Sequence, residues 1–249
     1  MKVIFRADDL GFSEAVNLGI LKVVQDGPIQ NVGLMTNMPS AQHGFELLKL
    51  FNIALGQHTN ISVGKPLSDP SKIQSLLDEK GEFCNSKVIN SRPIDSILVE
   101  EAEIEIEAQL SKFKEICGKN PDYFEGHAVF SKNFFIALKN VAKRHGLFYC
   151  DPFEPQWRQD TQIQVATFQK PGPGGVYDIH KYLIEDEAKI TGSDCALLIF
   201  HPGYIDQYLL DYSSYNLVRP MEVSFLTSDV CRQWLKEQNI QCVNFNTYR

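Results

Sequence analysis

Two adjacent carboxylates, Asp8 and Asp9, stand where an apolar, β-prone stretch near the start of the sequence ends. Gly11 and Ser13, a turn residue and a helix-capping residue, follow at once. Carboxylates at the exit of a buried strand are unfavourable for stability, because burial removes their hydration. They are well suited to hold a cation or to move a proton. This stretch is therefore a candidate catalytic site.

Three histidines occupy similar positions at or near the ends of later apolar stretches, namely His58, His127 and His201. Enzymes with parallel barrels build their active sites at the carboxyl edge of the strands, so these side chains are expected to meet Asp8 and Asp9 there. One Asp and two His would supply three metal ligands and leave positions open for water and substrate. The remaining Asp and His could act as general base and general acid. The set predicts metal-assisted hydrolysis of an amide or ester.

The elements that must position these side chains follow from the apolar pattern, which places one helix between successive strands, as in βαβ units around a parallel sheet. After the first strand, further strands are expected at 29–36, 53–61, 123–129, 147–150, 164–168, 196–200 and 240–245. Helices are expected at 13–25, 41–50, 95–117, 131–144 and 228–237, and from a turn-rich joint at 170–175 to about residue 189. The stretches 151–163 and 204–217 show no clear periodicity.

The chain is expected to form a single α/β domain over residues 1–249, because it contains neither an internal repeat nor a linker. One region breaks the alternation: residues 63–95 are rich in Pro, Gly, Ser and Asn. A connection of this length inside a compact domain is often a lid or a binding loop, although a surface insertion without a role is the alternative.

Composition narrows the function classes. The net charge is −7 and no cluster of Lys and Arg stands out, which argues against a nucleic-acid partner. No apolar stretch approaches the roughly 20 residues of a membrane span. The six cysteines form no CxxC pair, and no secretory leader is recognisable, so we expect a cytoplasmic protein without disulfides.

Several motifs together resemble the YdjC-like carbohydrate deacetylases, which include the chitooligosaccharide deacetylases. They are Ala7-Asp-Asp-Leu-Gly-Phe-Ser13, Leu55-Gly-Gln-His-Thr-Asn60, the mid-chain Gly126-His127 and the late His201-Pro-Gly203. The resemblance extends from Lys2 to the Arg219-Pro-Met-Glu222 segment. It implies a deformed (β/α) barrel of mainly parallel strands, similar to the polysaccharide deacetylases.

The resemblance also implies roles for the candidate residues. Asp9, His58 and His127 match the family's ligands for one divalent ion, Mg²⁺ or Zn²⁺. Asp8 matches the proposed catalytic base and His201 the proposed acid. The implied reaction removes N-acetyl groups from small sugars that contain N-acetylglucosamine. The segment 63–95 would help to wall the substrate groove, and a homodimer is among the expectations, because members are often dimers.

This sequence departs from the family pattern at two places. Glu125-Gly-His127-Ala-Val129 stands where many relatives have Asp, then Ser or Gly, then His-x-His, and Arg6 stands where they often have Asn. A guanidinium near the carboxylates could lower their pKa or bind an anionic substrate group. The candidate substrate contacts are Arg6, Glu125, Trp157, Arg158 and Tyr204.

Two alternatives to the deacetylase remain open at this point. The altered mid-chain motif would also suit a carbohydrate-binding or regulatory protein that has lost turnover. The position of Arg6 would also suit a metal hydrolase of another amide or ester that carries an anionic group.

Overall fold

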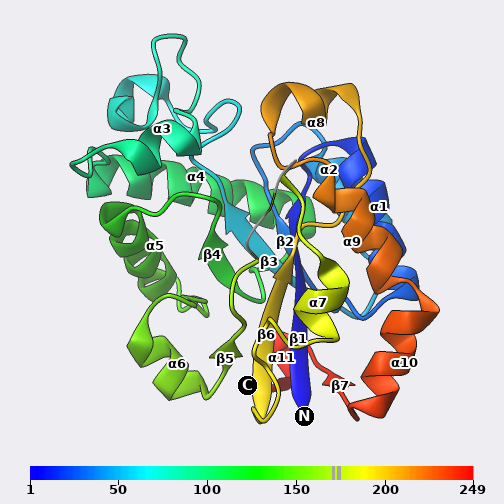
Figure 1. Cartoon of the computed structure of the whole chain (residues 1–249). Coiled ribbons are helices and arrows are strands. Elements are labelled where there is room, and N and C mark those ends of the chain that lie inside the picture. The colour runs from blue at the N-terminus through cyan, green and yellow to red at the C-terminus, as the bar shows by residue number, and fades with distance from the viewer. Residues whose placement is uncertain (170–171, 173–174, 249) are drawn as a thin grey trace.

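The computed structural model describes residues 1–169, 172 and 175–248, and its centre is a curved sheet of parallel strands (Figure 1). The order across the sheet is β4-β3-β2-β1-β6-β5, and β7 pairs with the first residues of β1. The strands are β1 (Lys2–Leu10), β2 (Asn31–Leu34), β3 (Ala54–Thr59), β4 (Phe124–Gly126), β5 (Gln164–Val165), β6 (Cys195–Phe200) and β7 (Gln241–Cys242). Every ladder between these strands is parallel, so the predicted deformed (β/α) barrel is confirmed.

The barrel is open on one side. Within the described residues no ladder joins β4 to β5, and the intervening chain pairs with β4 only through an isolated bridge between Phe124 and Tyr149. This gap is called the seam below. The strand expected at 147–150 is reduced to that bridge.

Helices pack around the sheet and bury its apolar residues (Figure 1). They are α1 (Glu14–Asp26), α2 (Ala41–Leu48), α3 (Ser86–Ser91), α4 (Val99–Cys117), α5 (Lys132–Arg144), α6 (Pro155–Thr161), α7 (Ile179–Leu183), α8 (Gln207–Tyr212), α9 (Val218–Leu226), α10 (Asp229–Glu237) and α11 (Phe245–Tyr248). Two 3₁₀ turns cover Pro70–Lys72 and Gln74–Leu76. In the part of the chain that the structure describes, no helix combines the length and apolarity needed to cross a bilayer.

Several helices differ from the sequence-based expectations, and α3, α9 and α11 were not predicted. The stretches 151–163 and 204–217 contain α6 and α8, each with a single buried residue, so neither produces an apolar repeat. The helix expected up to residue 189 ends at Leu183, and Asp186 follows with a left-handed φ of 57°. Most of the joint expected at 170–175 lies outside the described residues.

The segment 63–95 is fastened to the barrel at both ends. At its start, the buried carboxylate of Glu105 on α4 accepts hydrogen bonds from the backbone N–H groups of Leu67 and Ser68. At its end, Asp95 accepts hydrogen bonds from the Ser131 hydroxyl and the Asn133 backbone at the start of α5. These contacts fix the segment above the carboxyl ends of the strands.

Candidate active site

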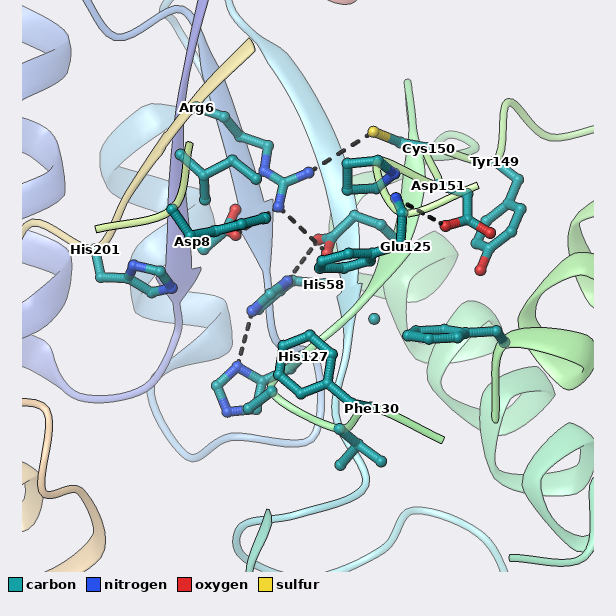
Figure 2. Close-up of a pocket in the computed structure, with 18 residues that line it drawn as sticks. Arg6, Asp8, His58, Glu125, His127, Phe130, Tyr149, Cys150, Asp151 and His201 are labelled. Atoms are coloured by element: carbon teal, nitrogen blue, oxygen red, sulfur yellow. Dashed lines mark hydrogen bonds and ion pairs between the residues drawn. The ribbon is translucent and has the colours of Figure 1, made fainter. Parts of the chain in front are cut away.

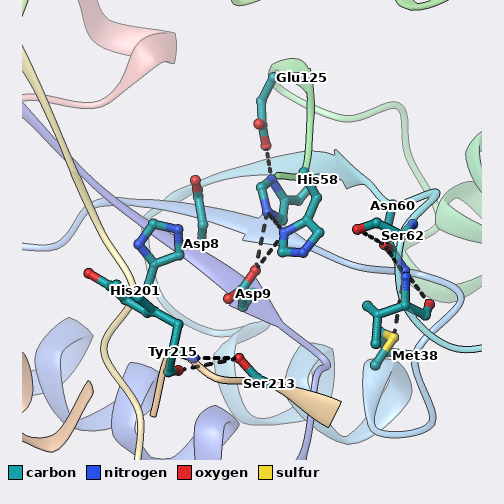
Figure 3. Close-up of polar contacts among 12 residues, drawn as sticks. Asp8, Asp9, Met38, His58, Asn60, Ser62, Glu125, His201, Ser213 and Tyr215 are labelled. Atoms are coloured by element: carbon teal, nitrogen blue, oxygen red, sulfur yellow. Dashed lines mark hydrogen bonds and ion pairs between the residues drawn. The ribbon is translucent and has the colours of Figure 1, made fainter. Parts of the chain in front are cut away.

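The two carboxylates at the end of β1 share one side of the sheet because the strand is irregular there. Neighbouring side chains on a regular strand point to opposite faces. Here Ala7 aligns with Val32 but Leu10 aligns with Leu34, so β1 has one extra residue, and Asp9 has a left-handed φ of 72°. A bulge of this kind redirects a side chain. It turns Asp8 and Asp9 toward the same site (Figure 3).

Asp9, His58 and His127 converge on one point. Asp9 Oδ1 lies 3.2 Å from His58 Nε2 and 3.1 Å from His127 Nδ1, and the two imidazole nitrogens are 2.9 Å apart. Asp9 and His58 are almost fully buried, whereas the side chain of His127 is 14% exposed. The first two reach this point from β1 and β3, and His127 follows β4 directly. The predicted meeting of distant strand ends is therefore present.

A second network surrounds Asp8. The guanidinium of Arg6 donates to Asp8 Oδ2 at 2.7 Å and lies 3.5 Å from Glu125 Oε2. Glu125 Oε1 is in turn 2.5 Å from His58 Nδ1 (Figure 2). When the imidazole of His58 is neutral, as a metal ligand must be, a hydrogen bond from Nδ1–H to the carboxylate leaves its lone pair on Nε2. Glu125 thus orients His58 toward Asp9 and His127.

The residues present fit a divalent cation held by Asp9, His58 and His127. Metal–ligand bonds of about 2.1 Å put neighbouring ligand atoms about 3 Å apart in an octahedral site and about 3.4 Å apart in a tetrahedral one, close to the separations of these three atoms. Asp9 Oδ1 is buried and has no hydrogen-bond partner in the described part of the chain. A second triad of Asp8, His58 and Glu125 is also close enough, but both of its carboxylates already face Arg6. A cation there would be repelled by the guanidinium.

A residue that sequence reasoning missed, Arg219 on α9, fixes the other carboxylate oxygen of Asp9. Its guanidinium donates to Asp9 Oδ2 at 2.7 Å, and its Nε donates to the backbone oxygen of Tyr215. Burial alone would raise the pKa of Asp9, but Arg219 and His127 outweigh it and hold that pKa well below its usual range. Asp9 is therefore ionised, as a metal ligand must be.

The pKa of Asp8 is also lowered. Burial acts to raise it, and the charges of Arg6 and His58 more than compensate. Asp8 is consequently an ionised carboxylate at neutral pH, with Oδ1 free of hydrogen bonds to the described residues. An ionised carboxylate with one unpaired oxygen can accept a proton from water.

His201 faces these carboxylates from the end of β6 (Figure 3). Burial lowers the pKa of His201 to about 4, so the imidazole is neutral at pH 7. Its Nδ1 lacks a hydrogen-bond partner in the described part of the chain. Its backbone N–H donates to Glu222 Oε2 at 2.6 Å, and its backbone oxygen lies 3.4 Å from a guanidinium nitrogen of Arg219. Residues of α9 therefore hold both His201 and Asp9.

Glu222 is a second missed residue, and it makes stability depend on pH. Burial raises its pKa to about 7, although Tyr177 and the His201 backbone donate hydrogen bonds to it. Because the folded-state pKa lies above the unfolded value, the folded state holds a proton that the unfolded state has released between these two pKa values. The stability contributed by this proton is complete below the unfolded pKa and is lost as the pH rises to about 7.

We therefore expect Glu222→Gln to remove this dependence while it keeps both contacts. Between about pH 5 and pH 7.5, the unfolding free energy of the native protein should fall relative to the variant by a few kcal/mol. Urea unfolding of both proteins at the two pH values measures this difference. Equal differences at both pH values would contradict the assignment.

Two cavities meet at the site. The first, the apolar chamber, has a volume of about 200 Å³, with Arg6, Asp8, His58 and Glu125 at its floor (Figure 2). Its apolar wall consists of Val129, Phe130, Phe135, Phe153, Phe168 and Ile199. The second, the polar groove, has a volume of about 780 Å³ and is lined by the polar residues Asn85, Ser86, Lys87, Asp211, Ser213 and Asn216. Apolar side chains, among them Phe12, Phe168 and Leu210, complete its lining. His127 and His201 border both cavities.

The structure gathers some of the sequence candidates and separates others. Arg6 and Glu125 border the apolar chamber. Trp157 is buried on α6 against Phe148, Arg158 is exposed on the same helix, and Tyr204 packs at the start of α1; all three lie outside both cavities. The aromatic type of Trp157 and Tyr204 did not reveal whether these residues pack in the protein or line a cavity.

Fold and site together place the protein in the class of polysaccharide-deacetylase-like folds. A family 4 acetyl xylan esterase from Clostridium thermocellum, solved in complex with a cobalt ion, aligns over 100% of this chain and 90% of its own with a TM-score of 0.50. The two sequences are 11% identical, so this likeness concerns the fold.

Within that class, the chain belongs to the YdjC-like protein family, whose model matches residues 2–237. Carbohydrate deacetylase 2 of Listeria innocua is 30% identical to it over 249 residues, which cover 99% of this chain and 98% of that protein. The crystal structure of a protein from Enterococcus faecalis aligns with a TM-score of 0.82 at 21% identity, over 99% of this chain and 98% of its own. The family predicted from the sequence motifs is confirmed.

Proposed function

We propose that this protein is a metal-dependent hydrolase that removes N-acetyl groups from small oligosaccharides containing N-acetylglucosamine. The observation that carries the proposal is the convergence of Asp9, His58 and His127 beside Asp8 and His201, where two cavities meet. Relatives named carbohydrate deacetylases that align along nearly the whole chain support the same activity.

Asp9, His58 and His127 would hold the cation, Mg²⁺ or Zn²⁺. When bound, such an ion polarises the amide carbonyl and lowers the pKa of water. Arg219 keeps Asp9 ionised and fixed, and Glu125 sets the tautomer of His58. These contacts are of the kind that orients metal ligands in advance.

Asp8 would accept a proton from the water that attacks the carbonyl carbon. His201 would then give a proton to the leaving nitrogen as the C–N bond breaks, which yields acetate and an amino sugar. Because its pKa of about 4 leaves His201 neutral at pH 7, this proton must reach the imidazole during the reaction. The proton that Asp8 takes from water is one source.

The polar groove would hold the sugar. Asn85, Ser86 and Lys87 reach it from the segment 63–95, which supports the expectation that this segment walls the substrate site. Arg6 is 3% exposed and already faces two carboxylates. This favours a role in holding Asp8, and argues against a role in binding an anionic group of the substrate. A homodimer and a cytoplasmic location stay predictions.

Acetate release from short N-acetylated chitooligosaccharides tests the proposal. We expect release that increases with added Mg²⁺ or Zn²⁺ and disappears after chelation. Folded protein that binds the sugars and releases no acetate with any metal would instead favour the carbohydrate-binding alternative.

A further inference from the structure

The two cavities differ in chemistry on the two sides of the reacting centre. An amide carbonyl carbon carries two substituents, here the acyl chain and the sugar nitrogen, which leave it in different directions. A substrate whose carbonyl lies between His127 and His201 must therefore place one substituent in each cavity. A sugar needs hydrogen-bonding partners, which the polar groove supplies with Asn85, Ser86 and Asn216. The acyl chain would then occupy the apolar chamber.

The wall of the apolar chamber is an aromatic cluster centred on Phe153. The centroid of the Phe153 ring lies 5.3 Å from that of Phe130, 6.0 Å from that of Phe135 and 5.4 Å from that of Phe168. Three of these rings keep 43–64% of their surface exposed, although they cluster at a cavity. Exposed apolar surface of this kind commonly marks a binding site for an apolar group.

The charges at the floor of the apolar chamber are ion-paired with one another, although Asp8 Oδ1 keeps no hydrogen-bond partner among the described residues. Arg6 faces Asp8 and Glu125, and Glu125 also contacts His58. A ligand in the chamber therefore does not need to bring a charge of its own. The chamber favours a neutral hydrocarbon group over an anionic one.

The backbone that carries part of this wall is tied to α3. Asn90 on α3 donates to the backbone oxygen of Ala128 and accepts from the backbone N–H of Phe130. Ala128 has a left-handed φ of 50°, which these two contacts help to maintain. The backbone at Phe130 is thereby fixed, and its side chain borders both cavities.

The volume of the chamber exceeds what an acetyl methyl group fills. A cavity of about 150 Å³ already binds benzene in another protein, and this one has about 200 Å³. Resting on the deacetylase function proposed above, we infer that the preferred substrates are amino sugars with an N-acyl group larger than acetyl, up to a hexanoyl or benzoyl group. The same hydrolysis then releases a medium-chain or aromatic carboxylate.

The test compares chitobioses acylated on nitrogen with acetyl, butanoyl, hexanoyl or benzoyl groups, with the released amine as the common readout. We expect kcat/KM to rise by about four-fold for each methylene group that enters the chamber. If the acetyl compound is hydrolysed and kcat/KM stays equal or falls as the chain lengthens, the inference is overturned while the proposed function stands.

A pair of variants localises the effect. Val129→Phe fills the chamber and should lower the ratio of kcat/KM for hexanoyl over acetyl by about tenfold or more. Leu210 lines the polar groove, so Leu210→Phe places a phenyl ring on the sugar side and should leave that ratio unchanged. An unchanged ratio in a folded Val129→Phe variant would also overturn the inference.

Binding separates failure of the inference from failure of the proposed function. If none of the compounds is hydrolysed with any metal, the proposed function fails, and calorimetry on the chelated native protein decides about the chamber. A higher affinity for the hexanoyl than for the acetyl compound supports an acyl-binding chamber. Equal affinities contradict it.

Discussion

Asp8→Asn is expected to lower kcat for deacetylation by about 10²–10⁴-fold, the usual contribution of a general base. The asparagine oxygen can still accept from the Arg6 guanidinium, so the contact of 2.7 Å and the local fold should remain. Its amide group cannot take a proton from water. The measurement is kcat together with the metal content of the purified variant, which should equal that of the native protein.

Asp8→Asn should therefore lose turnover and still bind its metal. If the Asp8→Asn variant loses its metal, Asp8 is a metal ligand. If the variant retains full turnover, Asp8 takes no part in the proton transfer. Circular dichroism serves as the control for folding.

Asp9→Asn should also lose activity, but here the bound metal should be lost as well. Asparagine tolerates the left-handed φ of 72° at this position, so the backbone should be preserved. With its oxygen turned to Arg219, the new side chain presents an NH₂ group where the cation would bind, and that group cannot ligate. We expect metal affinity to fall by more than the roughly 10–100-fold typical of changes behind the ligands.

Metal content and acetate release, measured over a series of metal concentrations, check this expectation. His127→Ala is the matched variant on the other side of the triad and should behave alike. If Asp9→Asn binds metal as tightly as the native protein does, the ligand set proposed here is wrong.

The sequence predicted the fold class and which polar residues lie near strand ends, because both depend on local patterns, whereas β4, β5 and β7 end earlier than expected. Asp8, His58, His127 and His201 each stand at or near the end of an apolar stretch, and parallel strands bring such ends together. The long helix α4 was predicted because its buried residues repeat on one face.

What the sequence did not reveal depends on contacts between distant residues. Arg219 and Glu222 lie on α9, which the apolar pattern of the sequence did not predict. Arg219 contacts Asp9, a residue 210 positions away in the chain. The family resemblance of the Arg219-Pro-Met-Glu222 segment was the one available signal. The bulge that turns both Asp8 and Asp9 toward one site was equally hidden, since it depends on how β1 aligns with β2.

The seam between β4 and β5 has a consequence for how this enzyme family could diversify. The wall of the apolar chamber includes Pro152 and Phe153, which follow the single bridge at Tyr149. Because no strand ladder among the described residues passes through this stretch, insertions and substitutions here would leave the hydrogen bonds of the sheet intact. The proposed metal ligands, in contrast, lie on or directly after paired strands. Evolution could thus change which acyl group is accepted while the catalytic centre stays under a separate and stricter constraint.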